Sequence, residues 1–317
     1  MVVRTTKLTE LVARPGHGRV FTEAARPGLA DCAPSGRVRL DALARFTQDI
    51  AYADASDAGL SETTWWVVRR TRMQVGRFPR FGQRLELATF CSGLGRMWAE
   101  RRTTIVGEDE GEGAGEVEVV SLWVHLDPRS GRPTPLREDE LAMWGDAAAG
   151  RKVTARLHHP GPEENADAYP WRFRITECDL AGHINNAAYF QPLEEELIQD
   201  GDPSSIDVEI EYRSPAQPGE TQILRNGSHR WIVGADGETL ASLIVAPNPP
   251  DRKLDAAVRG GAHPGRRRPT IDRRRDRISL AGPARRQGRA PGRKLPLDRE
   301  PGRRDARIAD RHQSGAI

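Results

Sequence analysis

The chain has 317 residues, with 48 Lys and Arg against 45 Asp and Glu and 37% apolar residues, a composition that suits one large or two medium-sized globular domains. Residues 251–317 hold 20 basic and 8 acidic side chains and no aromatic residue, whereas residues 1–250 hold 28 basic and 37 acidic ones. We therefore expect an acidic folded body followed by a disordered Arg-rich tail, residues 251–317, with too little apolar surface to fold. An acidic body excludes nucleic-acid binding through bulk charge.

The three cysteines indicate a reducing compartment. They are odd in number and lack CxxC spacing, so neither a disulfide framework nor a thiolate zinc site is expected. Polar residues interrupt the apolar runs near the N-terminus, and the longest later apolar run, Leu240 to Ala246, is too short to cross a bilayer. We expect a cytoplasmic protein that does not contact membranes.

The body contains a degenerate internal repeat. The segment Cys32–Val38 resembles Cys178–Ile184 at an offset of 146 residues, and Met73–Leu87 runs parallel to Ile210–Leu224 at an offset of 137. Two further short matches follow in the same order. Matches that recur in one order predict two copies of one structural unit.

Each copy is predicted to begin with a loop and a helix and to continue as strands. Five residues recur near a 3.6-residue period and predict a helix from about Leu40 to Asp54: Leu40, Leu43, Thr47, Ile50 and Ala51. In the second copy, apolar and acidic residues alternate strictly from Ile206 to Tyr212, which predicts a half-buried strand. Turn residues then separate short strands, so the sheet should be antiparallel. The expected fold is α+β, with a first unit at 18–140, a connection at 141–169 and a second unit at 170–250.

The loop before the second helix carries the densest group of polar residues. Asp179 and His183 lie in this loop, and Asn185 or Asn186 is placed to cap the helix. Free N–H groups at a helix start suit an oxyanion, and a neighbouring carboxylate can activate water. An alternative stays open, in which Asp179 forms only an Asx turn, His183 is a satisfied loop side chain and the asparagines only cap.

The chain resembles the acyl-acyl-carrier-protein (acyl-ACP) thioesterases, which carry two hotdog domains. The resemblance rests on three segments: Asp179-x-x-Gly182-His183-Ile184-Asn185-Asn186-x-x-Tyr189, Trp66–Arg70 and Gly95–Arg102. It covers about Phe21 to Pro247. It implies two tandem hotdog domains, each a long helix wrapped by an antiparallel sheet, and hydrolysis of fatty acyl thioesters in fatty acid biosynthesis.

The resemblance also implies roles for individual residues. Asp179 matches the aspartate that activates water in hotdog thioesterases, and His183 matches the histidine that orients or polarises. Asn185, Asn186 and Glu195 are expected to support them. Plant members have an asparagine where this chain has Ala181, a glutamate at Pro215 and a cysteine at Ala216, so a cysteine nucleophile is not expected.

Two other functions remain open from the sequence. Hotdog enoyl hydratases or dehydratases use an Asp and a His before the helix with different spacing, and the departures from the plant pattern leave room for a non-catalytic acyl-thioester-binding protein. The expected partner is acyl carrier protein or a CoA thioester, and nine arginines between Arg69 and Arg102 form either a docking face for an acidic carrier or the solvated face of strands. No metal or organic cofactor is implied, and the assembly is expected to be a monomer with an internal pseudo-dimer or a homodimer.

Overall fold

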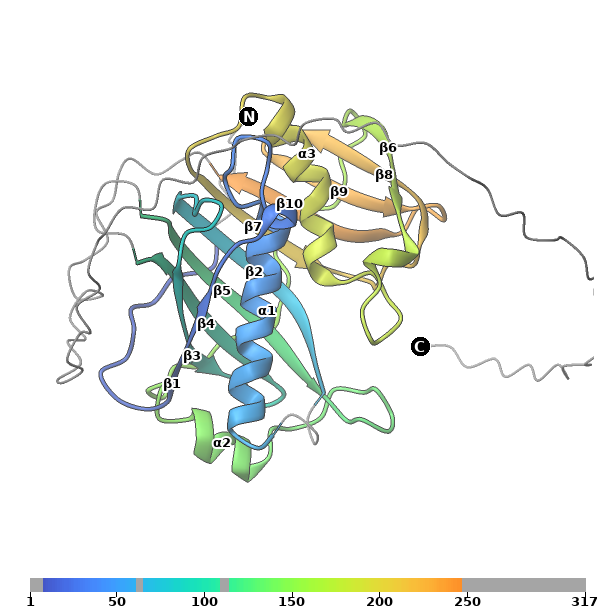
Figure 1. Cartoon of the computed structure of the whole chain (residues 1–317). Coiled ribbons are helices and arrows are strands. Elements are labelled where there is room, and N and C mark those ends of the chain that lie inside the picture. Colours follow the sequence, from blue (N-terminus) through green and yellow to red (C-terminus); the bar gives the residue numbers. More distant parts are fainter. Residues whose placement is uncertain (1–7, 61–64, 109–113, 247–317) are drawn as a thin grey trace, which may run out of the picture. The chain divides into compact units, whose positions relative to one another are not determined.

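The computed structural model describes residues 8–60, 65–108 and 114–246, and the expected tail lies outside these ranges (Figure 1). The first copy contains these elements: β1 Val20–Ala25, α1 Leu40–Asp57, β2 Trp65–Arg77, β3 Leu85–Leu94, β4 Trp98–Gly107 and β5 Glu116–Leu126. A short helix, α2 Glu138–Trp144, follows. The second copy contains these: β6 Asp167–Phe173, the 3-10 helix η3 Asn186–Phe190, α3 Gln191–Gln199, β7 Ile206–Tyr212, β8 Gly219–Asn226, β9 His229–Gly234 and β10 Thr239–Ala246.

All ten strands form one antiparallel sheet. Its strand order is β1-β3-β4-β5-β2-β7-β10-β9-β8-β6. The strands of the first copy run from the edge strand β1 to the central strand β2, and the equivalent strands of the second copy follow in the reverse order, from β7 to the edge strand β6. The copies meet where β2 pairs with β7, and Arg72 opposite Glu209 is the pair that maps onto itself under the offset of 137. The pairs on either side of it are equivalent to each other: the offset of 137 converts the pair Thr71–Ile210 into the pair Val208–Met73. The repeat predicted from sequence therefore forms an internal pair related by an approximate two-fold axis at Arg72 and Glu209.

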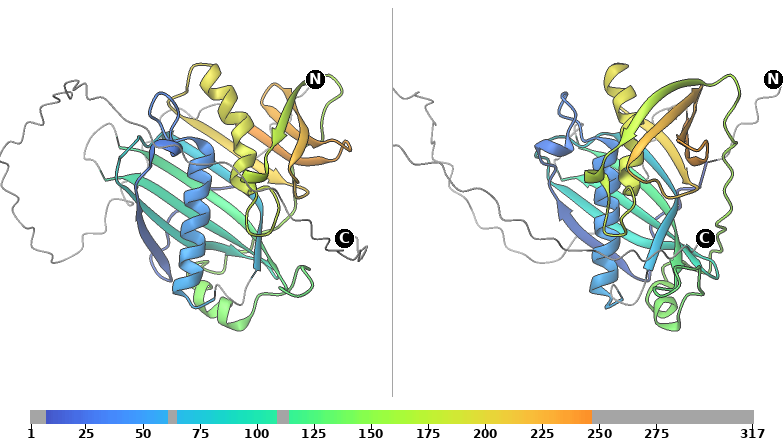
Figure 2. Two further views of the ribbon diagram at one scale, coloured as in Figure 1. Left: turned by 45° about the vertical axis from the view of Figure 1, so that its right-hand side comes forward. Right: turned by 90° about the vertical axis from the view of Figure 1, so that its right-hand side faces the viewer.

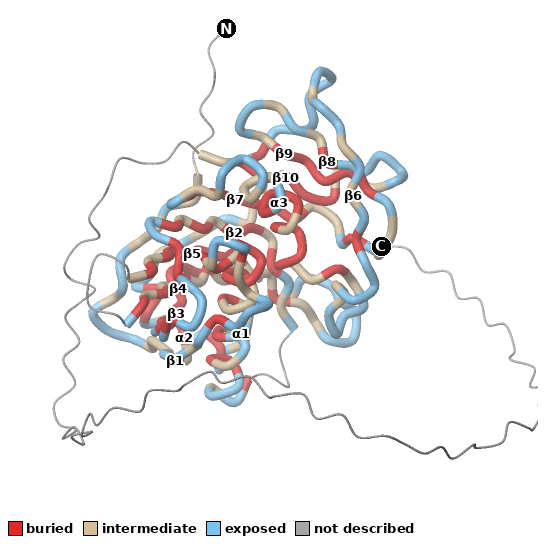
Figure 3. Tube along the Cα trace, turned by 45° about the horizontal axis from the view of Figure 1, so that its top comes forward, coloured by how far each residue is buried: buried red, intermediate tan, exposed pale blue. Residues whose placement is uncertain are grey.

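Both long helices lie against the same face of this sheet (Figures 1 and 2). Helix α1 begins at the predicted Leu40 and extends three residues beyond the predicted end, to Asp57. Its side chains Leu40, Leu43 and Ile50 are buried in a core shared with both copies, whereas Tyr52 is exposed. Figure 3 colours the Cα trace by burial and shows buried segments in the helices and in the strands of both copies. A helix wrapped by an antiparallel sheet in each copy confirms the predicted α+β hotdog fold.

The second helix is broken into two parts. The tight turn η3 covers Asn186–Phe190 and the α-helix starts at Gln191, with Pro192 in its first turn. Proline fits there because the first N–H groups of a helix have no intrahelical partner. Pro192 therefore lies where the tight turn gives way to the α-helix.

The prediction that β7 is half-buried was wrong, because every residue of this strand is buried. The apolar side chains face the helices, and the acidic ones point to the other face of the sheet. There the segment near Thr9 and the connection near His159 cover them: Thr9 N–H donates to Glu209 Oε2 at 2.7 Å, and His159 N–H donates to Glu211 Oε2 at 3.0 Å. Segments distant in sequence thus bury what alternation alone marks as a solvated face.

Two edge strands were missed by the sequence analysis. β1 precedes the first helix and pairs with β3, and β6 precedes the second helix and pairs with β8. β6 starts inside the expected connection 141–169 and contains Pro170. Proline cannot donate a ladder hydrogen bond, so it is compatible with an edge strand but gives a weak strand signal in sequence.

Candidate active site

The Asp179 loop and its first-copy counterpart have the same backbone hydrogen bonds. Asp179 N–H donates to His183 O at 2.9 Å, and Ala33 N–H donates to Arg37 O at 2.8 Å. The glycines of the two loops, Gly36 and Gly182, have φ values of +85° and +75°, a region that favours glycine. Asp179 and His183 therefore occupy the places that Ala33 and Arg37 hold in the first copy.

Asp179 is exposed at the tip of its loop. Its Oδ1 accepts a hydrogen bond from Ala181 N–H at 2.9 Å, which makes an Asx turn. The second carboxylate oxygen has no hydrogen-bond partner among the described residues. The neighbouring Leu180 is also fully exposed. Asp179 thus forms the Asx turn of the alternative interpretation with one carboxylate oxygen, and its other oxygen is available to water.

His183 and the two asparagines surround the start of η3. The His183 ring is half-buried and has no hydrogen-bond partner in the described part of the chain. Asn185 caps the helix, because its Oδ1 accepts from Ala187 N–H at 2.9 Å. Asn186 contributes its carbonyl oxygen, which accepts from the Tyr212 hydroxyl at 3.1 Å. Burial raises the pKa of Tyr212 well above its ordinary value, so this hydroxyl remains a donor.

Tyr189 is buried behind the loop and packs against neighbouring aromatic rings. Its hydroxyl accepts a hydrogen bond from Ala216 N–H at 2.7 Å, and its ring packs against those of Phe173 and Tyr212. Burial raises the pKa of Tyr189 to about 12; the hydrogen bond from Ala216 opposes that rise, and the charge of Asp179 adds to it. The sequence analysis did not assign roles to Tyr189 and Tyr212, although the first belongs to the quoted motif and the second ends an alternating strand.

Glu195 lies apart from these residues in an open groove. It is exposed on α3, and the groove is also lined by Arg39 and Asp41 at the start of α1. Its neighbour Glu194 is buried and contacts the first copy's loop through Arg37, with Nη1 2.9 Å from Oε1. The structure thus brings Asp179, His183 and both asparagines together in one loop and sets Glu195 beside the first copy.

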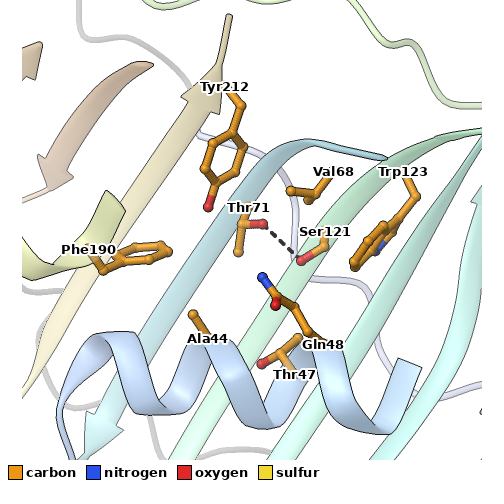
Figure 4. A pocket seen from close by; sticks show the side chains of 9 residues that line it. All are labelled: Ala44, Thr47, Gln48, Val68, Thr71, Ser121, Trp123, Phe190 and Tyr212. Carbon is orange, nitrogen blue, oxygen red and sulfur yellow. Dashed lines mark hydrogen bonds between the residues drawn. The ribbon is translucent and has the colours of Figure 1, made fainter. Parts of the chain in front are cut away.

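A small cavity lies between α1 and the sheet, next to η3 (Figure 4). It is lined by nine residues: Ala44, Thr47, Gln48, Val68, Thr71, Ser121, Trp123, Phe190 and Tyr212. Thr71 and Ser121 share a hydrogen bond of 3.0 Å in its wall. The cavity volume is about 10 Å³, room for about one water molecule. Tyr212 joins the cavity to the Asp179–His183 loop, because its hydroxyl donates to the Asn186 carbonyl oxygen.

Several of the nine arginines considered as a docking face are bound within the protein. Arg72 pairs with Asp207, Arg101 with Asp54 and Arg102 with Glu118. Arg69 donates to two backbone carbonyls, those of Tyr212 and Arg213. These four side chains are held within the sheet. The exposed members of the group are Arg77, Arg80, Arg84 and Arg96.

The described part of the chain shows no metal site and no membrane-spanning helix. No group of three His, Cys, Asp or Glu side chains there could hold a metal ion. No described helix is long and apolar enough to cross a membrane. Cys32, Cys91 and Cys178 are free thiols, and burial raises the pKa of Cys91 to about 11, which disfavours its reactive thiolate form.

Comparison with known proteins identifies the first copy. Residues 19–144, from β1 to α2, match the family model described as the acyl-ACP thioesterase N-terminal domain. The resemblance to acyl-ACP thioesterases is thereby confirmed. The match indicates that this chain is a thioesterase, a hydrolase of thioester bonds.

Similar proteins match this thioesterase across both of its copies. An uncharacterised protein of Mycobacterium tuberculosis is 27% identical over 241 residues, which is 74% of this chain and 95% of that protein. An acyl-ACP thioesterase from Bacteroides thetaiotaomicron has a TM-score of 0.58 at 16% identity, over 72% of this chain and 98% of that one. A 12:0-ACP thioesterase from Umbellularia californica has a TM-score of 0.57 at 20% identity, over 72% of this chain and 97% of that one. These similarities show a common double-hotdog fold.

Proposed function

We propose that this protein hydrolyses fatty acyl thioesters of acyl carrier protein, with CoA thioesters as the alternative substrate, and releases free fatty acids in fatty acid biosynthesis. The observation that carries the proposal is the Asp179–His183 loop at the start of η3, in a chain whose first copy matches the acyl-ACP thioesterase family. The 12:0-ACP thioesterase and the acyl-ACP thioesterase among the similar structures support the same substrate class.

The proposed reaction is general-base hydrolysis. The free oxygen of Asp179 takes a proton from water, and the water oxygen forms a bond to the thioester carbonyl carbon. The negative charge that develops on the carbonyl oxygen is stabilised by the N–H groups at the start of η3. The C–S bond then breaks, and the sulfur leaves as a thiolate that accepts the proton through His183. One water and one thioester thus give one acid and one thiol, without a cofactor.

The acyl chain is proposed to enter the cavity between α1 and the sheet. Its lining includes the apolar side chains of Trp123, Phe190 and Val68. Its place beside Tyr212 would hold an acyl chain with its carbonyl near Asn186. With room for about one water, the cavity must widen by movement of lining side chains when the chain enters.

Assembly and location complete the proposal. We expect a monomer whose two copies form an internal pair, or a homodimer of such chains, because the copies already pair through β2 and β7. We expect it to act in the cytoplasm, where carrier-bound acyl groups and reduced thiols are found together.

The test measures thiol release from panels of acyl-ACP and acyl-CoA substrates of different chain length. Enoyl thioesters are assayed in parallel for hydration. Thiol release with a preference for the carrier-bound substrates supports the proposal. Hydration without thiol release would replace it with a hydratase, and tight binding without either reaction would replace it with an acyl-thioester-binding protein.

A further inference from the structure

The approximate two-fold axis relates the contacts of one copy's helix to those of the other. In the sheet, the register of β2 and β7 is symmetric about Arg72 and Glu209. Between the helices, Ala44 and Phe190 are equivalent under the offset of 146 and both line the same cavity, where they face each other (Figure 4). A contact between the first copy's loop and α3 therefore has a counterpart between the second copy's loop and α1.

In the first copy, the start of α1 is occupied by a carboxylate. Glu194 of α3 accepts a hydrogen bond from Leu40 N–H at its Oε2, at 3.0 Å, and its Oε1 lies 2.9 Å from Arg37 Nη1. The Glu194 and Arg37 side chains are each only 4% exposed. A negatively charged oxygen is stable at a helix N-terminus because it meets an unpaired N–H and the positive end of the helix dipole.

The second copy has different residues at the equivalent places. Under the offset of 146, Asn186 corresponds to Leu40, His183 to Arg37 and Gln48 to Glu194. Among the described residues the Asn186 N–H makes no backbone hydrogen bond outside its helix. The neutral Gln48 projects from α1 into the cavity beside η3 (Figure 4). Where the first copy holds a built-in carboxylate, the second copy leaves a donor open.

We propose that Gln48 of the first copy completes the oxyanion hole of the second copy, with its side-chain Nε2–H and the Asn186 N–H both donating to the thioester carbonyl oxygen. This inference rests on the proposed function and names a substrate-contacting residue for it. Glu194 Oε2 on Leu40 N–H marks, in the other half of the molecule, the place that the carbonyl oxygen takes. In the first copy, Glu194 occupies the N–H group at the start of α1. In the second copy, the equivalent residue Gln48 leaves the N–H group at the start of η3 free for the substrate.

Gln48→Met tests the donor, because methionine keeps the length of the side chain and removes its N–H groups. We expect kcat for thioester hydrolysis to fall about 100-fold, the effect of losing one oxyanion-hole donor, with a smaller change in KM. Gln48→Glu should lower kcat further, since its carboxylate would accept the Asn186 N–H as Glu194 accepts that of Leu40. Gln199→Glu, the same substitution at an exposed position of α3, is the matched control and should retain activity within about twofold.

Binding is measured separately from turnover. The probes are ketone analogues of octanoyl-CoA and palmitoyl-CoA, in which a methylene group replaces the sulfur and the carbonyl remains. Wild-type protein should bind an analogue at least about tenfold more tightly than Gln48→Met, even if it hydrolyses no thioester, so failure of the proposed function is seen independently. Melting temperatures identify variants that fail to fold, and Gln48→Glu then serves as the second variant. Equal analogue binding by wild type and folded variants, or Gln48→Met turnover within threefold of wild type, would overturn the inference.

Discussion

Ala33 and Asp179 hold the same position in two loops with the same backbone hydrogen bonds, and only one of them carries a carboxylate. The partner positions differ in the same sense, since Arg37 stands where the second copy has His183. Arg37 is buried against Glu194 and Asp202, and an arginine does not accept a proton at accessible pH. The chain therefore has one loop with acid-base groups and one loop that serves as structure.

This asymmetry predicts one ligand site per chain. Titration with a non-hydrolysable acyl-thioester analogue, followed by calorimetry, should saturate at one ligand per chain. Bulky substitutions such as Asp179→Phe and His183→Trp should abolish that binding. Saturation at two equivalent ligands per chain would contradict the division of roles between the copies.

Asp179→Asn should remove most of the hydrolysis and leave the fold intact. The amide oxygen can still accept from Ala181 N–H, so the Asx turn is preserved, but the side chain can no longer take a proton from water. We expect kcat to fall by about 10²- to 10⁴-fold, the usual contribution of a general base, with an unchanged melting temperature.

The matched control for this variant is Asp236→Asn. Asp236 is exposed in the turn before β10, and its Oδ1 accepts from Glu238 N–H at 3.0 Å, so it has the same local geometry outside the loop. Its activity should equal that of wild type. Thiol release by Asp179→Asn within a few fold of wild type would show that Asp179 is only a turn residue.

Arg37→Met should destabilise the protein through the charge that it leaves behind. Glu194 would remain buried with Leu40 N–H as its hydrogen-bond donor and without its cation, which costs about 3 kcal/mol in the free energy of unfolding. The double variant Arg37→Met with Glu194→Gln should recover much of that loss. Chemical denaturation of the single and double variants measures this coupling, and simple additivity of the two effects would argue against it.

Asp41 should make stability depend on acid pH. Burial raises the pKa of Asp41, but hydrogen bonds from Arg39 and Arg45 outweigh it and hold the pKa below its ordinary value. Its contribution is therefore present above the unfolded pKa of about 3.9 and is lost as pH falls through the lower, folded value.

Melting curves of wild type and Asp41→Asn provide the measurement. The variant should melt at a lower temperature near neutral pH, and the difference should shrink as pH drops below about 4. A difference that stays constant down to the acid unfolding limit would mean that the ion pairs of Asp41 contribute nothing.

The sequence by itself determined the features that depend on local pattern. The start of α1 at Leu40 and the two-copy repeat were both predictable, because helical period and strand alternation are properties of neighbouring residues. The Asp179 and His183 positions followed from the motif for the same reason.

Only the tertiary structure decided which parts of the two copies meet. The sequence assigned Glu195 to the Asp179 site because its helix was expected to line that site. The helix contacts instead run between copies, from Glu194 to Arg37. Burial of the acidic face of β7 likewise depends on Thr9 and His159, which lie far away in the chain. These contacts are set by the pairing of β2 with β7 about Arg72 and Glu209, and residue spacing along one strand carries no information about its partner across such an axis.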